Sequence, residues 1–218
     1  MLDWGKVWIV KAGKPPECAV PVRGGVSVGT GQRGVQETSA WLSGRHKNLS
    51  VNFSGGDPLV VDKFTQTVDS VLNDIPALRS EIKLVGLSRV SNGFAQYDYN
   101  RLSLSINRNT AGKMAAKHLK EMQLAGRKGF LLMPLGKEYE AMVSHEMGHA
   151  LTTVLQKNPN TRQAAIAMLN GPAPKGISEY AASNIQEGIA EAFAQMRTIP
   201  KGEWAPFTEE LSKLVGRL

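Results

Sequence analysis

The sequence predicts an α+β fold in which a small mixed or antiparallel sheet precedes a mostly helical C-terminal half. Three observations lead to this prediction. Alternating stretches typical of half-buried strands are concentrated between residues 81 and 107. A strong amphipathic helical pattern precedes them, and from residue 137 onward most of the chain has helical periodicity. With 218 residues, of which 42% are hydrophobic, the chain is long enough to bury a sizeable core.

Residues 1–56 are predicted to form an irregular extension with short strands, ahead of a domain that spans residues 57–218. A strand is expected at 7–10, and prolines interrupt the segment after it. Gly29, Gly31 and Gly34 spell G-x-G-x-x-G, a dinucleotide-binding pattern that needs a helix opening at its third glycine. Because the segment that follows, residues 36–44, is short and polar, we expect these glycines to form a flexible loop and no nucleotide site.

The first clear helix is predicted for residues 57–76. Asp57 can cap its N-terminus, and Pro58 suits the first helical position. The apolar positions recur at close to 3.6 residues, which predicts one buried face. That face consists of Val60, Phe64, Val68, Val71 and Ile75.

Strands and a further helix are predicted for the middle of the chain. Residues 81–90 alternate like a half-buried strand, and 93–107 have the pattern of a hairpin that turns at Asn100 and Arg101. Residues 110–126 predict a helix with a basic outer face that carries His118 at the surface. His46 lies in a predicted loop with no partner pattern.

The remaining helices are predicted at 137–157, 161–171, 183–197 and 207–218. Gly171 ends the second of them and Pro200 stops the third.

Composition excludes several classes of protein. No apolar run approaches the roughly 18–20 residues of a membrane span, and the single cysteine, Cys18, cannot form an internal disulfide or a cysteine-rich zinc finger. The net charge of +7 is concentrated in residues 1–137, but the basic residues are scattered, so we expect a solvated surface and no nucleic-acid partner. The N-terminus lacks a secretory leader, which predicts a cytoplasmic protein or one released or packaged by a non-classical route.

The pattern that carries chemistry is H-E-x-x-H at residues 145–149. Residues four apart on a helix project side by side, so His145 and His149 can bind one Zn²⁺. Glu146 lies on the same side and can act as a general base without being a ligand.

A third ligand is expected downstream of this pair. No histidine follows His149, so the ligand should be a carboxylate, and the candidates before Pro200 are Glu179, Glu187 and Glu191. Glu187 and Glu191 share a helix face among small and apolar residues, where carboxylates need a metal or an imidazole N–H as partner. Glu179 stands at a loop end, where we expect it to be solvated.

The segments "HEMGHA" and "SEYAASNIQEGIAEAF" resemble the gluzincin metallopeptidases, most closely the lethal-factor-like catalytic domains and related phage and toxin zincin modules. The resemblance covers residues 140–199. It implies a zincin-like domain with His145, His149 and Glu187 as zinc ligands. It also implies Glu146 as the general base, Tyr180 as a hydrogen-bond donor to the transition state and Glu191 as acceptor for a ligand imidazole.

The implied function is a zinc-dependent endopeptidase that hydrolyses peptide bonds through a zinc-bound water. In such enzymes an edge strand pairs with extended substrate, which makes Tyr97 and Tyr99 of the predicted hairpin candidates for contact with a peptide or protein substrate. A plain core hairpin is an equal alternative. Two other functions remain open: a protease that cleaves repressors, and a zincin-fold structural or binding module of a phage or toxin assembly.

Overall fold

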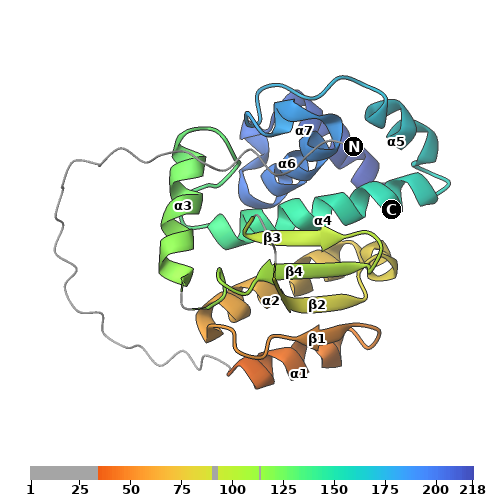
Figure 1. Ribbon diagram of the computed structural model, residues 1–218. Helices are drawn as coiled ribbons and strands as arrows, with labels where there is room; N and C mark the ends of the chain where they lie inside the picture. The colour runs from red at the N-terminus through yellow and green to blue at the C-terminus, as the bar shows by residue number, and fades with distance from the viewer. Residues whose placement is uncertain (1–33, 90–92, 113) are drawn as a thin grey trace, which may run out of the picture. The chain divides into compact units, whose positions relative to one another are not determined.

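The computed structural model describes residues 34–89, 93–112 and 114–218, and these form an α+β fold around a small mixed sheet (Figure 1). The strands are β1 (Ser50–Asn52), β2 (Leu84–Ser88), β3 (Ala95–Asp98) and β4 (Ser103–Asn107). Their order is β1-β2-β4-β3, with β1, β2 and β4 parallel and β3 antiparallel to β4. The predicted fold class is therefore confirmed at the level of α+β, with the sheet of the mixed kind.

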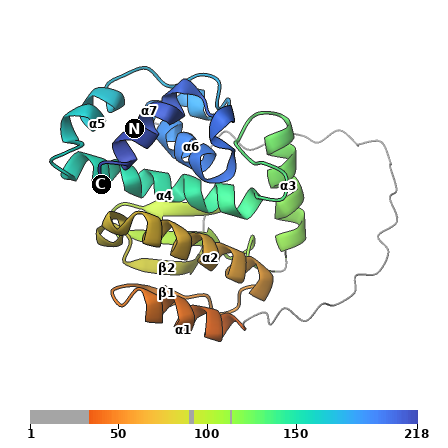
Figure 2. The ribbon, with the colours of Figure 1, turned by 180° about the vertical axis from the view of Figure 1, so that it is seen from behind.

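Helix α2 (Pro58–Asp74) forms where the sequence predicts a helix. The Asp57 side chain accepts hydrogen bonds from the N–H groups of Leu59 and Val60, which satisfies donors that have no partner within the helix. The helix lies along one face of the sheet, as the view from behind shows (Figure 2), and its apolar side chains share one buried cluster with those of the strands. All five predicted core residues are buried: Val60, Phe64, Val68, Val71 and Ile75.

The predicted hairpin is formed by β3 and β4, in a register that places Tyr97 opposite Leu104. The Asp98 carboxylate closes the turn by accepting from the N–H groups of Asn100 and Arg101. Strand β3 is an edge of the sheet, and the long helix α4 (Glu138–Lys157) runs beside it (Figure 1). This arrangement puts the H-E-x-x-H motif next to the free side of an antiparallel edge strand.

The C-terminal half is helical, as predicted, and no described residue after β4 belongs to a strand. Helix α3 (Ala115–Arg127) leads to α4, which is followed by α5 (Arg162–Leu169), α6 (Ile185–Thr198) and α7 (Pro206–Val215). Single 3-10 turns occur at Pro76–Ser80, Ala181–Ser183 and Lys201–Glu203. None of the described helices combines the length and the apolar composition that crossing a membrane requires.

The N-terminal boundary differs from the prediction. The compact unit is Arg33–Leu218, and it includes helix α1 (Val35–Arg45) and strand β1, both within the segment predicted to be an irregular extension. Helix α1 was missed because its apolar pattern is weak and it buries only Thr38 and Leu42. Strand β1 belongs to the domain because it pairs with β2. The expected strand at 7–10 and the glycines before Gly34 lie outside the described residues.

Candidate metal centre

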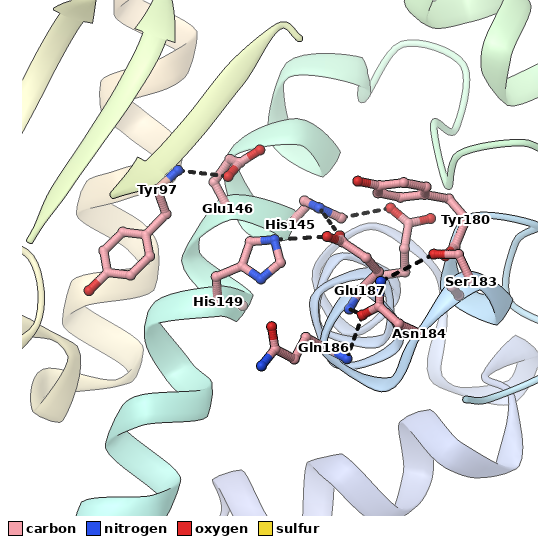
Figure 3. Close-up of polar contacts among 12 residues, drawn as sticks. Tyr97, His145, Glu146, His149, Tyr180, Ser183, Asn184, Gln186 and Glu187 are labelled. Carbon is pink, nitrogen blue, oxygen red and sulfur yellow. Dashed lines mark hydrogen bonds and ion pairs between the residues drawn. The ribbon is translucent and has the colours of Figure 1, made fainter. Parts of the chain in front are cut away.

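Helix α4 supplies three of the predicted site residues. Its ends suit the helix dipole, since Glu138 and Glu140 lie in the first turn and Lys157 in the last. Most of its residues are buried, because α4 packs against α6, α2 and β3. The imidazoles of His145 and His149 therefore project into the interface between α4 and α6 rather than into open solvent (Figure 3).

Helix α6 is brought close to α4 by small residues. A methyl group on Gly148 would lie only 2.7 Å from the Cα atom of Ala190, so the glycine permits the two backbones to approach. The start of α6 is fixed by Asn184, whose side chain accepts from the N–H groups of Gln186 and Glu187 at 3.0 Å each. Glu187 thus occupies the first turn of α6, opposite the two histidines.

The three predicted ligands converge. Glu187 Oε2 lies 3.2 Å from His145 Nε2 and 3.5 Å from His149 Nε2, and one ligand atom from each residue lies within 4.8 Å of the others. Two ligands of a tetrahedral zinc ion are about 3.3 Å apart when each metal–ligand bond is about 2.0–2.1 Å. Glu187 Oε2 is buried and has no hydrogen-bond partner among the described residues. An orphaned, buried carboxylate oxygen facing two imidazole nitrogens fits a divalent metal ion.

The Glu187 carboxylate and the neighbouring imidazole of His145 shift each other's pKa values. Burial alone would raise the pKa of Glu187, but the imidazoles of His145 and His149 lower it far below its usual value of 4.5. Burial alone would lower the pKa of His145, but the carboxylates of Glu187 and Glu191 raise it well above 6.5. In the metal-free protein a proton on His145 therefore compensates part of the negative charge that a metal ion would otherwise neutralise.

Glu146 is held by the edge strand. Its Oε2 accepts a hydrogen bond of 2.8 Å from the backbone N–H of Tyr97 (Figure 3). This N–H points away from β4, toward α4, because backbone N–H groups alternate in direction along a strand and β3 has a partner strand on one side only. The contact joins residues 49 positions apart in sequence and fixes the carboxylate next to the two histidines.

Glu191 is fully buried and contacts the His145 ring, as the resemblance implies. Its Oε1 lies 2.8 Å from His145 Nδ1, on the opposite side of the ring from Glu187. This contact leaves Nε2 as the atom that faces the candidate metal position. His149 Nδ1, in contrast, is buried with no hydrogen-bond partner among the described residues.

Tyr180 lies over the same ring. It stacks on His145 with ring centroids 5.8 Å apart and an interplanar angle of 28°, and its other neighbour is Phe130 at 5.7 Å. Burial, followed by the negative charges of Glu187 and Glu146, raises the pKa of Tyr180 above 10. The phenol therefore keeps its proton at neutral pH and can donate it in a hydrogen bond.

The two tyrosines predicted to contact substrate differ from each other. The Tyr97 side chain is buried in the core, where its hydroxyl donates to the carbonyl of Glu81 at 2.9 Å, so the ring cannot line a substrate surface. The prediction is wrong for this side chain because alternation along β3 turns it into the core, as in the alternative of a plain core hairpin. Tyr99 is 47% exposed, and its ring centroid lies 6.3 Å from that of His149. Burial, with Glu187 and Glu146 nearby, raises the pKa of Tyr99 to about 12.

The other histidines and Glu179 lie apart from this site. Glu179 is exposed, as expected. His118 is half-buried and hydrogen-bonds to Thr110. His46 is not the unpartnered loop residue that was predicted, since it is buried and its Nε2 lies 2.9 Å from Asp69 Oδ1. That pair joins α1 to α2, a tertiary contact for which the local sequence gives no signal.

Two contributors to the site were missed by sequence reasoning. The backbone N–H of Leu132 and the hydroxyl of Ser178 both donate to Glu191 Oε2, each at 2.7 Å. Both belong to loops, and no spacing rule connects them to a residue 59 or 13 positions away.

Compared with known proteins, the chain matches no family model, no curated protein and no solved structure. The assignment of function below therefore rests on the residues and their geometry.

Proposed function

We propose that this protein is a zinc-dependent endopeptidase of the gluzincin type, with a zincin-like arrangement of sheet and helices. The observation that carries the proposal is the convergence of His145, His149 and Glu187, with Glu146 and Tyr180 beside them. The antiparallel edge strand β3 beside the motif helix supports the zincin-like assignment.

In the proposed site His145 and His149 bind zinc through Nε2 and Glu187 binds through its carboxylate. The bound ion would supply a Lewis acid that polarises the scissile carbonyl and lowers the pKa of water. Side chains of the protein supply the general base and the hydrogen-bond donor. These groups can act together only if the ion is held between α4 and α6, beside them.

Glu146 is the proposed general base. It accepts a proton from the attacking water and transfers that proton to the departing amine. The hydrogen bond from the Tyr97 N–H fixes one carboxylate oxygen, which limits the conformations of a side chain that must act on a water molecule. Tyr180 keeps its proton and donates a hydrogen bond to the oxyanion of the tetrahedral intermediate.

Substrate is proposed to bind as an extended peptide along the outer edge of β3, by strand addition. Tyr99 follows this strand and is exposed beside His149, so its ring would contact a substrate side chain close to the scissile bond. Of Tyr97 only the backbone carbonyl is available to substrate, because its ring is buried and its N–H is held by Glu146.

The test is zinc analysis combined with cleavage-site profiling on a peptide library, for the wild type and for Glu146→Gln. We expect about one zinc per chain in both proteins, and hydrolysis by the wild type alone. Equal zinc content with no hydrolysis by either protein would favour the structural or binding module. Absence of zinc from both would refute the metal site itself. Cleavage confined to a repressor-like protein would favour the regulatory protease.

A further inference from the structure

Glu191 accepts more hydrogen bonds than it needs to orient the imidazole of His145. Besides His145 Nδ1, it accepts from the Leu132 N–H and from the Ser178 hydroxyl, both through Oε2. The residue is 0% exposed and, within the described chain, forms no ion pair with a lysine or arginine. A buried carboxylate of this kind depends on its hydrogen-bond donors for stability, so each of the three contacts constrains its position.

The donors come from two loops that lie side by side. The N–H groups of Glu179 and Tyr180 donate to the carbonyls of Gly129 and Phe130, each at 2.9 Å. The segment 129–132 therefore pairs with the segment 178–181, and both loops also hydrogen-bond Glu191.

Ser178 has two roles within this arrangement. Its hydroxyl donates to Glu191 and accepts from the N–H of Ala181 at 2.9 Å. The accepted bond closes the turn that contains Tyr180, whose ring stacks on His145. These contacts form a closed ring of residues. His145 contacts Glu191, Glu191 accepts a hydrogen bond from Ser178, and the turn that begins at Ser178 carries Tyr180, whose ring stacks on His145.

We propose that Ser178 is a positioning residue that acts through Glu191, and that it couples metal binding at His145 to the placement of the turn that carries Tyr180. The inference rests on the proposed zinc site. Binding of a metal ion to Nε2 fixes the His145 ring, the ring fixes Glu191, and Glu191 holds Ser178 and Leu132 in place. Without the Ser178 hydroxyl, Glu191 is connected to the tyrosine turn only by the longer route through Leu132 and the paired segment 129–132 among the described contacts.

The experiment measures zinc dissociation constants by competition with a chromophoric chelator. Loss of a hydrogen-bond partner behind a metal ligand weakens affinity by roughly 10- to 100-fold. Ser178 lies one contact further from the metal, behind Glu191, so we expect Ser178→Ala to weaken zinc affinity by about tenfold, the lower end of this range. Ser178→Thr keeps the hydroxyl and should restore affinity to within about threefold of the wild type. Ser183→Ala is the matched control, because its hydroxyl lies in the same segment but donates to the Tyr180 carbonyl and not to Glu191. It should leave the zinc dissociation constant unchanged.

A double-mutant cycle tests whether the effect passes through Glu191. If it does, Ser178→Ala adds little to Glu191→Gln, whereas additive losses of affinity would overturn the proposal. Hydrogen exchange gives a readout independent of affinity. Zinc should slow exchange of the Leu132 and Ala181 amides in the wild type, and in Ser178→Ala the Ala181 amide should exchange rapidly with or without zinc.

The proposed zinc site and the role of Ser178 can be refuted separately. A wild-type protein that binds no zinc refutes the proposed function. A wild type that binds zinc, with Ser178→Ala binding equally well, refutes the role of Ser178 and leaves the proposed function intact. A lower melting temperature for Ser178→Ala with an unchanged zinc dissociation constant would likewise assign Ser178 a purely structural role.

Discussion

Replacement of Gly148 by alanine is expected to weaken zinc binding without touching any metal ligand. Gly148 lies on α4 between His145 and His149 and faces the middle of α6. A methyl group at this position would lie 2.7 Å from Ala190 Cα and 3.3 Å from Phe193 Cβ. Both neighbours belong to α6, the helix that carries Glu187, so the added atom pushes against the element that supplies the third ligand.

The size of the effect follows from these distances. Ordinary carbon–carbon contact begins near 3.4 Å, so the backbones must separate by about 0.7 Å. Metal–ligand distances tolerate only about 0.2 Å, so Glu187 can no longer bind together with His145 and His149. We expect zinc affinity to fall at least about 100-fold, since even the loss of an outer partner costs 10- to 100-fold. Overpacking of this kind destabilises the fold by about 1–3 kcal/mol.

Chelator competition measures the affinity, and urea unfolding of the metal-free protein measures the stability. Gly44→Ala is the control, because Gly44 is also helical but has no neighbour within 4 Å of the added methyl. It should raise stability by about 0.5–1 kcal/mol and leave zinc binding unchanged. A folded Gly148→Ala protein that binds zinc as tightly as the wild type would refute the idea that this helix crossing sets the ligand geometry.

Four further predictions concern the site. Zinc affinity should rise about tenfold per pH unit as the pH rises toward the raised pKa of His145, because below that pKa zinc must displace a proton; a flat profile by calorimetry would contradict this. The same proton stabilises the metal-free protein below pH 6.5, and thermal melts should show that contribution disappearing as the pH rises through the raised pKa of His145. Tyr180→Phe should lower kcat about 100-fold or more in peptide hydrolysis with zinc binding intact, and an unchanged kcat would exclude it as an oxyanion donor. Tyr99→Ala should raise KM roughly 3- to 10-fold with little change in kcat, whereas an unchanged KM would remove Tyr99 from the substrate-binding surface.

The sequence predicted best those features that repeat along one element. Helix α2 has a strong apolar stripe and a capping aspartate, and the hairpin alternates on both strands, so each was recognised from local pattern. The meeting of His145 with Glu187 was expected from the resemblance to the gluzincins, because spacing alone left Glu179, Glu187 and Glu191 as candidates. Helical geometry then fixes which side chains share a face.

Other features depend on contacts that no local pattern encodes. Helix α1 buries too few residues to show a periodicity, and the parallel pairing of β1 with β2 joins segments more than thirty residues apart. The Tyr97 N–H and the Leu132 N–H are backbone groups, which any residue at those positions would present. The residue types at these positions carry no information about such backbone contacts, so only the fold reveals that these N–H groups hold Glu146 and Glu191.

The hydrogen bond between Glu146 and Tyr97 also bears on self-association. An exposed strand edge is a template for pairing with another chain, and β3 is such an edge. Glu146 occupies one of its outward N–H groups, so the proposed catalytic carboxylate removes one of the donors through which a second copy could pair. An inactive variant for crystallisation or substrate trapping should therefore be Glu146→Gln, whose amide oxygen still accepts this bond. Glu146→Ala would leave the N–H open and invite edge-to-edge aggregation.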